Sequence, residues 1–209
     1  MASKLRKTSD RPLQSARVII CEGSDESDIL GWIRAQRGLS EDDIEILDAK
    51  GRSNLSTLLG DLRYLSGGSD VELVVVVLDA EERSGADQAL LQRLGAIAQD
   101  QGFGYLPHVL PNPESAGALE TLVRMHVDAD APASTCADAW EACLSPAVAA
   151  RTKAQQDKAW GHVWLAGQGA FHSRLGHALA NNAGVRDRLP AVIQHFEKLL
   201  DHVLGIPLK

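Results

Sequence analysis

Two short acidic segments, each following an apolar run, contain the residues best suited to chemistry. Glu22 follows the apolar run at residues 16–21, and Asp79 and Glu81 follow a second run at residues 73–78. Carboxylates at the carboxyl ends of neighbouring buried strands meet at one edge of a sheet, where open α/β folds place their ligand sites. Crowded carboxylates repel one another unless a divalent cation neutralises them. The pattern therefore predicts a site for Mg²⁺ or Mn²⁺.

Glu22 is followed by Gly23, which allows the backbone to turn tightly from a strand into a helix. In the predicted site, Glu22 would bind a metal or act as a general base facing a phosphate. Taken alone, Glu22 is better explained as an acid that stabilises a helix N-terminus by up to ~1 kcal/mol. The second acidic segment favours the functional interpretation.

Asp79 and Glu81 are two residues apart, so both side chains point the same way if the strand remains extended. That arrangement could bind one or two hard cations. Glu82 would replace Glu81 as a ligand if the chain turns early. The alternative is a polar strand exit with solvated acids, but three acids within four positions after an apolar run favour a site.

Four further residues are secondary candidates for this site. Asp25 lies in the first turn of a predicted helix, where the helix dipole also favours an acid. Glu120 begins another predicted helix and could add a carboxylate at the same sheet edge; a helix-surface role explains it equally well. Lys158 and His162 lie four residues apart on one helical face. They could neutralise a phosphate or orient a ligand, although a solvated face is the more favoured explanation.

The elements that must position these residues alternate between strand and helix in the first half of the chain. The third predicted strand has no polar alternation, as expected of a central parallel strand covered on both faces. Beyond residue 113 the hydrophobic period is helical. Strands are predicted at residues 16–21, 44–49, 73–78 and 105–110, and helices at 25–37, 53–65, 86–101, 116–127, 137–144, 148–164 and 189–204.

These elements predict a three-part organisation. Residues 1–15 are expected to form a flexible N-terminus, and residues 16–127 an α/β domain. Residues 128–209 are expected to form a helical C-terminal extension packed on that domain. The best linker candidate is the segment at residues 128–134, which is rich in Asp, Ala and Pro.

Composition narrows the function classes. The chain has 209 residues and a net charge of −7, which argues against nonspecific coating of nucleic acid but not against a nuclease. Three cysteines without a paired framework, no secretory signal and no membrane-length apolar run predict a cytoplasmic protein without membrane contact. A polyanionic substrate would need a local basic rim, for which the candidates are Lys50, Arg52, Arg83, Arg151, Lys153 and Lys158.

The ordered set of motifs resembles a known domain. A Glu-Gly pair after the first predicted strand, an acidic pair after the third and the βαβαβα order resemble the TOPRIM domain of topoisomerases, bacterial primases and OLD-family nucleases. Residues 110–120 (LPNPESAGALE) resemble a Pro-Asp-Asn…Gly-x-Leu-Glu stretch of a small, uncharacterised TOPRIM-like bacterial family related to OLD-type nucleases. Residues 158–166 (KAWGHVWLA) resemble that family's later Lys-Ala…His…Leu-Ala segment. The likeness extends from about residue 16 to the last predicted helix.

This resemblance implies a TOPRIM-like, Rossmann-like fold with a mainly parallel sheet flanked by helices. It also implies an Mg²⁺- or Mn²⁺-dependent phosphodiesterase acting on nucleic acid. Glu22 takes the place of the motif glutamate, Asp79 that of the first metal aspartate and Glu81 that of the second. Glu81 departs from the pattern, because Glu is one methylene longer than Asp and metal spacing or occupancy would differ. A separate ATPase partner, as in OLD-type systems, is a further implication, and homodimerisation stays open.

Two alternatives belong to other function classes. A catalytically silent TOPRIM-like domain serving as a binding or regulatory module would explain the Glu-for-Asp change and the acidic charge. A phosphoryl-accepting receiver-like domain would also place Asp79 after its third strand, but it leaves residues 111–120 unexplained.

Overall fold

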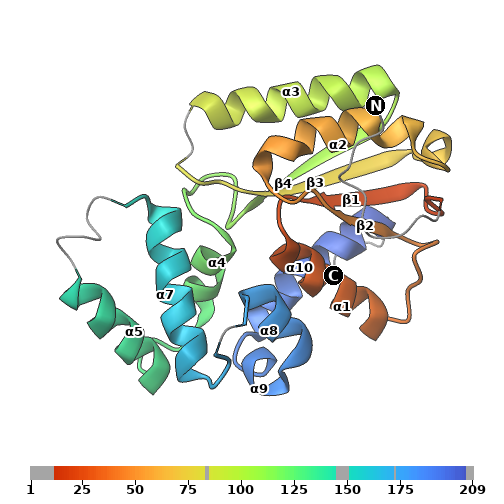
Figure 1. Cartoon of the computed structure of the whole chain (residues 1–209). Helices are drawn as coiled ribbons and strands as arrows, with labels where there is room; N and C mark the ends of the chain where they lie inside the picture. The colour runs from red at the N-terminus through yellow and green to blue at the C-terminus, as the bar shows by residue number, and fades with distance from the viewer. Residues whose placement is uncertain (1–11, 83–84, 145–150, 172, 206–209) are drawn as a thin grey trace.

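The computed structural model describes residues 12–82, 85–144, 151–171 and 173–205. Four parallel strands form its central sheet in the order β2-β1-β3-β4 (Figure 1). Helices flank both faces, so the predicted α/β, Rossmann-like fold class is confirmed. The strands are β1 (Arg17–Cys21), β2 (Glu45–Asp48), β3 (Leu73–Asp79) and β4 (Gly104–Leu110).

The helices occupy most of the remaining chain. Short 3₁₀ turns at Arg52–Asn54 and Leu62–Tyr64 flank α2, and another at Gly68–Asp70 precedes β3. The helices are α1 (Ser24–Gln36), α2 (Leu55–Asp61), α3 (Gly85–Gln101), α4 (Leu119–His126), α5 (Pro132–Cys143), α7 (Lys153–Gly167), α8 (Leu175–Asn181), α9 (Ala183–Arg186) and α10 (Pro190–Leu204).

The two central strands are buried on both faces, as the apolar run at residues 73–78 predicts. Alternate side chains of a strand point to opposite faces, so each strand contributes to two separate cores. Ile19, Cys21, Val75 and Val77 enter one core. Val18, Ile20, Val74 and Val76 enter the other core, and all eight are fully buried.

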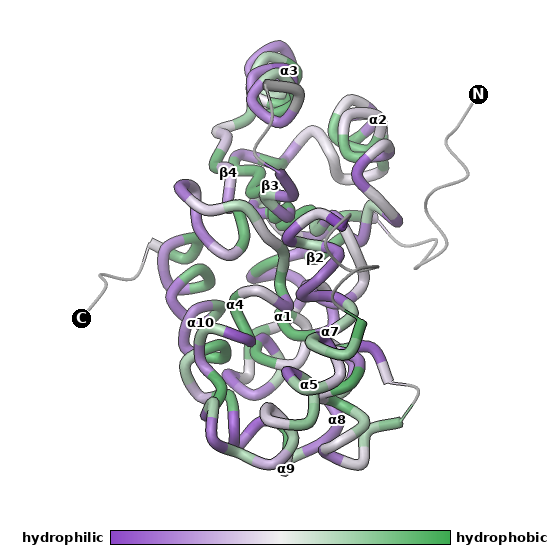
Figure 2. The backbone as a smooth tube through the Cα atoms, turned by 90° about the vertical axis from the view of Figure 1, so that its left-hand side faces the viewer, coloured by the Kyte–Doolittle hydropathy of each residue, from purple (hydrophilic) through white to green (hydrophobic). Residues whose placement is uncertain are grey.

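Helices α2 and α3 cover one face of the sheet, and α1 and α10 cover the opposite face (Figure 1). Figure 2, turned by 90°, shows α2 and α3 together at one end of the molecule, with the sheet next and the other helices beyond it. The molecule therefore has a helical layer on each face of the sheet. The carboxyl ends of β1 and β3 lie side by side at one edge of that sheet.

The C-terminal helices share a core with the sheet. Trp160 and Trp164 of α7 and Phe196 of α10 belong to the same buried cluster as Ile19 and Val75. The predicted boundary between residues 127 and 128 falls directly after α4. The segment expected to link the two parts is short, since α5 begins at Pro132. Proline is tolerated at the first helical position because the amide there needs no helical partner.

Two further differences concern short or terminal segments. Helices α8 and α9 were not predicted, because seven and four residues are too few to establish a helical period. Of the predicted flexible N-terminus, residues 1–11 lie outside the described residues. Leu13 is buried, and its amide donates a hydrogen bond to the Ser66 carbonyl at 2.7 Å. Among the described residues, every helix is too short or too polar to cross a lipid bilayer.

Candidate metal centre

The ends of β1 and β3 bring three carboxylates together. One carboxylate oxygen from each of Glu22, Asp79 and Glu81 lies within 4.8 Å of the other two. The parallel register pairs Cys21 with Val77, so Glu22 follows β1 beside the last residues of β3. The Asp79 amide donates a hydrogen bond to the Glu22 carboxylate at 3.3 Å. The predicted convergence at the sheet edge is therefore present in the fold.

Glu81 reaches the cluster by a different route from the expected one. Strand β3 ends at Asp79, and Glu81 adopts a left-handed conformation with φ of 49°. The expectation that the strand stays extended from Asp79 to Glu81 is therefore wrong. The chain turns instead because Glu81 pairs with Gly117 through two backbone hydrogen bonds of 2.8 and 2.9 Å. A non-glycine residue in such a sparsely populated backbone region costs about 1–3 kcal/mol, and such residues are common at functional sites.

Gly117 is required at its position for two reasons. Its φ is 144°, which L side chains rarely adopt, and a Cβ there would lie 2.4 Å from the Thr121 hydroxyl. The tight turn also leads into α4, whose first residue is Leu119. The Leu119 amide donates to the Asp79 carboxylate at 3.1 Å, so a helix N-terminus contributes to the site.

Lys158 of α7 supplies a cation between two of the carboxylates. Its ammonium nitrogen lies 2.9 Å from Asp79 Oδ2 and 3.5 Å from Glu81 Oε1. Although burial opposes it, the neighbouring Asp79 raises the pKa of Lys158, so the ammonium stays charged. The predicted role of Lys158 as a site residue gains this geometric support.

Arg52 is the second basic residue at the site. Its guanidinium donates to the Asp79 carbonyl at 2.9 Å and lies 3.4 Å from the Glu22 carboxylate. It also forms an ion pair with Asp87 of α3. Among the other rim candidates, Lys50 pairs with Asp48. Arg151 is exposed, Lys153 pairs with Asp157 and Arg83 lies outside the described residues.

A cavity of about 220 Å³ opens beside the cluster, and five of its ten lining residues are acidic. Lys158 is the basic residue among them. Glu81 is not part of this lining and approaches Asp79 from the adjacent turn. The acidic lining residues are Glu22, Asp25, Glu26, Asp79 and Glu120.

Glu26 was not predicted as a site residue. It is buried, and its carboxylate accepts a hydrogen bond from the Gly23 amide at 3.2 Å. A sequence signal existed: a Glu three residues after a helix N-cap folds back toward the N-cap amide. In this chain the N-cap follows β1, so the fold-back directs Glu26 toward the sheet edge.

Burial and mutual repulsion raise the pKa values of these carboxyls. Burial, then Asp79, raises the pKa of Glu22 to about 7 and that of Glu120 to about 7. The same two causes raise the pKa of Glu26 to about 8. Burial also raises the pKa of Asp79, against the lowering effect of Lys158. The cluster therefore retains protons near neutral pH that a bound cation would displace.

The remaining predicted site residues, Asp25, His162 and Glu82, lie outside the three-carboxylate cluster. The Asp25 carboxylate lines the cavity, accepts a hydrogen bond from the Gly176 amide at 3.0 Å and lies 3.8 Å from Arg174. Burial raises the pKa of Asp25, and His162 is among the neighbours that oppose this shift. The His162 side chain is exposed outside the cavity lining, and Glu82 is exposed outside the three-carboxylate cluster.

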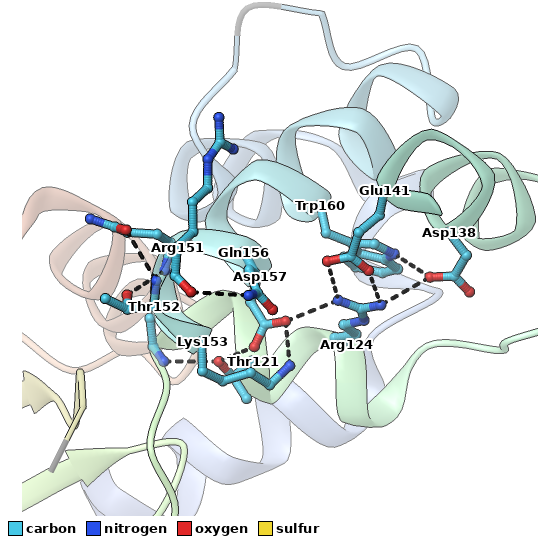
Figure 3. Close-up of polar contacts among 12 residues, drawn as sticks. Thr121, Arg124, Asp138, Glu141, Arg151, Thr152, Lys153, Gln156, Asp157 and Trp160 are labelled. Atoms are coloured by element: carbon cyan, nitrogen blue, oxygen red, sulfur yellow. Dashed lines mark hydrogen bonds and ion pairs between the residues drawn. The ribbon is translucent and has the colours of Figure 1, made fainter. Parts of the chain in front are cut away.

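A second polar network joins α4, α5 and α7 (Figure 3). Asp157 of α7 is fully buried and accepts hydrogen bonds from the Thr121 hydroxyl at 2.6 Å and Arg124 at 3.1 Å. Thr121 in turn accepts a hydrogen bond from the Ala118 amide at 2.9 Å. These hydrogen bonds fix the start of α4, where the Leu119 amide contacts Asp79. Sequence reasoning missed this network because Thr121 and Asp157 lie 36 residues apart.

The donor set suits a hard divalent cation. All three converging ligand atoms are carboxylate oxygens, which Mg²⁺ and Mn²⁺ prefer over nitrogen or sulfur. Neighbouring oxygens of an octahedral Mg²⁺ ion lie about 2.9 Å apart, since Mg²⁺ binds oxygen at about 2.0–2.1 Å. The three oxygens, which lie within 4.8 Å of one another, would therefore have to move closer together by up to about 2 Å around a single ion. Glu22, Asp79 and Glu81 are the residues that would hold such an ion.

The fold and this site define a class: a Rossmann-like α/β protein with a carboxylate cluster at the carboxyl ends of its central strands. Residues 16–204 match the model of the family described as "Protein of unknown function (DUF3226)". The chain belongs to this family, and the match includes the sheet, the cluster and the C-terminal helices. No curated protein and no solved structure matches the chain.

Proposed function

We propose that the protein is an Mg²⁺- or Mn²⁺-dependent phosphodiesterase of TOPRIM type that acts on nucleic acid. The observation that carries the proposal is the approach of the Glu22, Asp79 and Glu81 oxygens to within 4.8 Å of one another. They meet beside a cavity in which half of the lining residues are acidic. Repelling carboxylates around a cavity are the arrangement expected where a divalent cation and a phosphate bind together.

Each residue has a role in this proposal. Glu22, Asp79 and Glu81 would hold the ion, which when bound supplies charge neutralisation at the phosphate and an acidified water. Lys158, whose side chain is 40% exposed, would contact a non-bridging phosphate oxygen. As an alternative to binding an ion, Glu22 would accept the proton of the attacking water.

The proposed substrate and partners are supported by the family resemblance and by the positive charge near the carboxylates. Arg52 and Lys158 place positive charge beside the carboxylates, and Arg174 adds a partly exposed guanidinium near Asp25. The resemblance to OLD-type nucleases supports nucleic acid as substrate, a separate ATPase as partner and a cytoplasmic location. Homodimerisation is compatible with the same proposal.

A cleavage assay tests the activity. Wild type, Glu22→Gln and the matched control Glu82→Gln would be incubated with labelled single- and double-stranded DNA and RNA in Mg²⁺, Mn²⁺ or EDTA. We expect wild type and Glu82→Gln to cleave only with metal, and folded Glu22→Gln to be inactive. Unchanged cleavage by Glu22→Gln would contradict the mechanism.

The second candidate is a catalytically silent binding module. Lys158 favours it, because an ammonium 2.9 Å from Asp79 already compensates part of the negative charge. This function predicts folded wild type with no cleavage of any substrate in either metal. It also predicts a stable protein complex in a pull-down, and that complex would survive in Glu22→Gln.

A further inference from the structure

Four of the seven histidines gather around the groove between β4 and α10, on surfaces that share no lining residue with the carboxylate cavity. His108 of β4 and His195 and His202 of α10 line a second cavity of about 340 Å³. His126, the last residue of α4, lies close enough to His195 to influence its pKa. The proposed phosphodiesterase chemistry uses none of these residues.

His108 and His195 face each other directly. Their Nε2 atoms are 2.9 Å apart, so one ring donates a hydrogen bond and the other accepts it. Both rings are partly buried and are held by rigid elements. His108 is held by the pairing of β4 with β3 at Val77, and His195 lies in the middle of α10.

The spacing suits two ligands of one transition-metal ion. With metal–nitrogen distances of about 2.0–2.1 Å, a nitrogen separation of 2.9 Å corresponds to an angle of about 90° at the ion. Opening the pair by a few tenths of an ångström gives the tetrahedral angle that Zn²⁺ adopts. The ion would replace the proton that the two rings share.

A metal ion needs an unprotonated Nε2 on both rings, so the ring that donates the hydrogen bond must carry its proton on Nδ1 when the ion binds. Burial, followed by the neighbouring His195, lowers the pKa of His108 to about 4. Burial, then His126 and Lys198, lowers the pKa of His195. Neutral imidazole is the ligating form of histidine. The residues lining this cavity include no carboxylate, so its donors favour nitrogen-seeking ions over Mg²⁺.

We propose that His108 and His195 form a second metal site, specific for a nitrogen-preferring divalent ion such as Zn²⁺ or Ni²⁺. Water completes the coordination. The bound ion joins α10 to β4, the edge strand of the sheet.

Calorimetric Zn²⁺ titration of the full chain in excess Mg²⁺ tests the site, because Mg²⁺ keeps the carboxylates occupied. His108→Phe and His195→Phe preserve ring volume and remove the ligand nitrogen. His177→Phe, at an exposed position of α8, is the matched control. We expect one Zn²⁺ per wild-type chain, the same for His177→Phe and Asp79→Asn, and at least about tenfold weaker binding in the two groove variants.

A second readout separates ligand loss from misfolding. Zn²⁺ should raise the thermal midpoint of wild type and His177→Phe but not that of folded His108→Phe or His195→Phe. Co²⁺ bound to wild type should show the absorption of nitrogen coordination, and the groove variants should lose it. Absent Zn²⁺ binding in wild type, or equal binding in the groove variants, would overturn the proposal.

Discussion

Two clusters of charged residues lie on either side of the start of α4, and their charge balance differs. The cluster around Asp157 combines three acids with Arg124 and Lys153. Arg124 pairs with Asp138, Glu141 and Asp157, and its guanidinium lies 5.1 Å from the centre of the Trp160 ring (Figure 3). The carboxylate cavity has five acids and the single cation of Lys158 among its lining residues.

The difference indicates which cluster needs a ligand. In the Asp157 cluster, every acid has a basic partner within 3.1 Å, so its charges are compensated within the protein. In the cavity, burial and repulsion raise carboxyl pKa values although Lys158 lies 2.9 Å from Asp79, so its charges are only partly compensated. The first cluster stabilises the fold and positions α4 and α7. The second has the charge deficit that a divalent cation would remove.

Glu22→Gln should have the largest effect on activity and should show that the carboxylate cavity, unlike the Asp157 cluster, does not stabilise the fold. We expect cleavage to fall by at least a hundredfold, the lower range for losing a general base. In EDTA at pH 8 the variant should be as stable as wild type or more stable, because a repelled charge is removed. Assays of cleavage and urea unfolding on the same samples measure both effects. Parallel loss of activity and stability would place Glu22 with the structural cluster.

Asp157→Asn should have the opposite effect. Removing one charge of a buried network leaves Arg124 and Lys153 without their shared partner, which we expect to cost about 3 kcal/mol. That is the lower end for a buried pair, because both cations also contact water. Urea denaturation measures the loss. Asp138→Asn, at a 52% exposed side chain, is the control and should cost less than about 1 kcal/mol.

Stability should also depend on pH in a manner set by the cavity. Glu22 and Glu26, with pKa values of about 7 and 8, bind protons in the folded protein that the unfolded chain has already lost above about pH 5. The free energy of unfolding should therefore fall as pH rises from about 5 to 8 in EDTA. Mg²⁺ should reduce this slope, and Glu26→Gln should remove part of it. A flat profile in EDTA would argue against uncompensated carboxyls.

Lys158→Met should give the smallest effect. Removing the ammonium removes a competitor for Asp79 and Glu81, so we expect Mg²⁺ to bind several-fold more tightly while cleavage weakens. Lys198→Met, at an exposed position of α10, should change neither property. Weaker Mg²⁺ binding in Lys158→Met would show that Lys158 organises the carboxylates instead of competing for them.

Sequence reasoning predicted the sheet and the three converging acids for physical reasons. Uninterrupted apolar runs identify strands buried on both faces, and parallel strands end at a common edge. The left-handed turn at Glu81 could not be predicted, because it depends on pairing with Gly117. The Asp157 network and the His108–His195 pair also escaped prediction, since 36 and 87 residues separate their members.

The most direct test of the central claim is calorimetric titration of Mg²⁺ and Mn²⁺ at neutral pH in two buffers of different ionisation enthalpy. Wild type should bind a divalent cation and release protons, because the carboxyls retain them before binding. Glu22→Gln should bind at least about tenfold more weakly, and Glu82→Gln should match wild type. Absent binding by folded wild type, or equal binding by Glu22→Gln, would contradict a metal centre at this sheet edge.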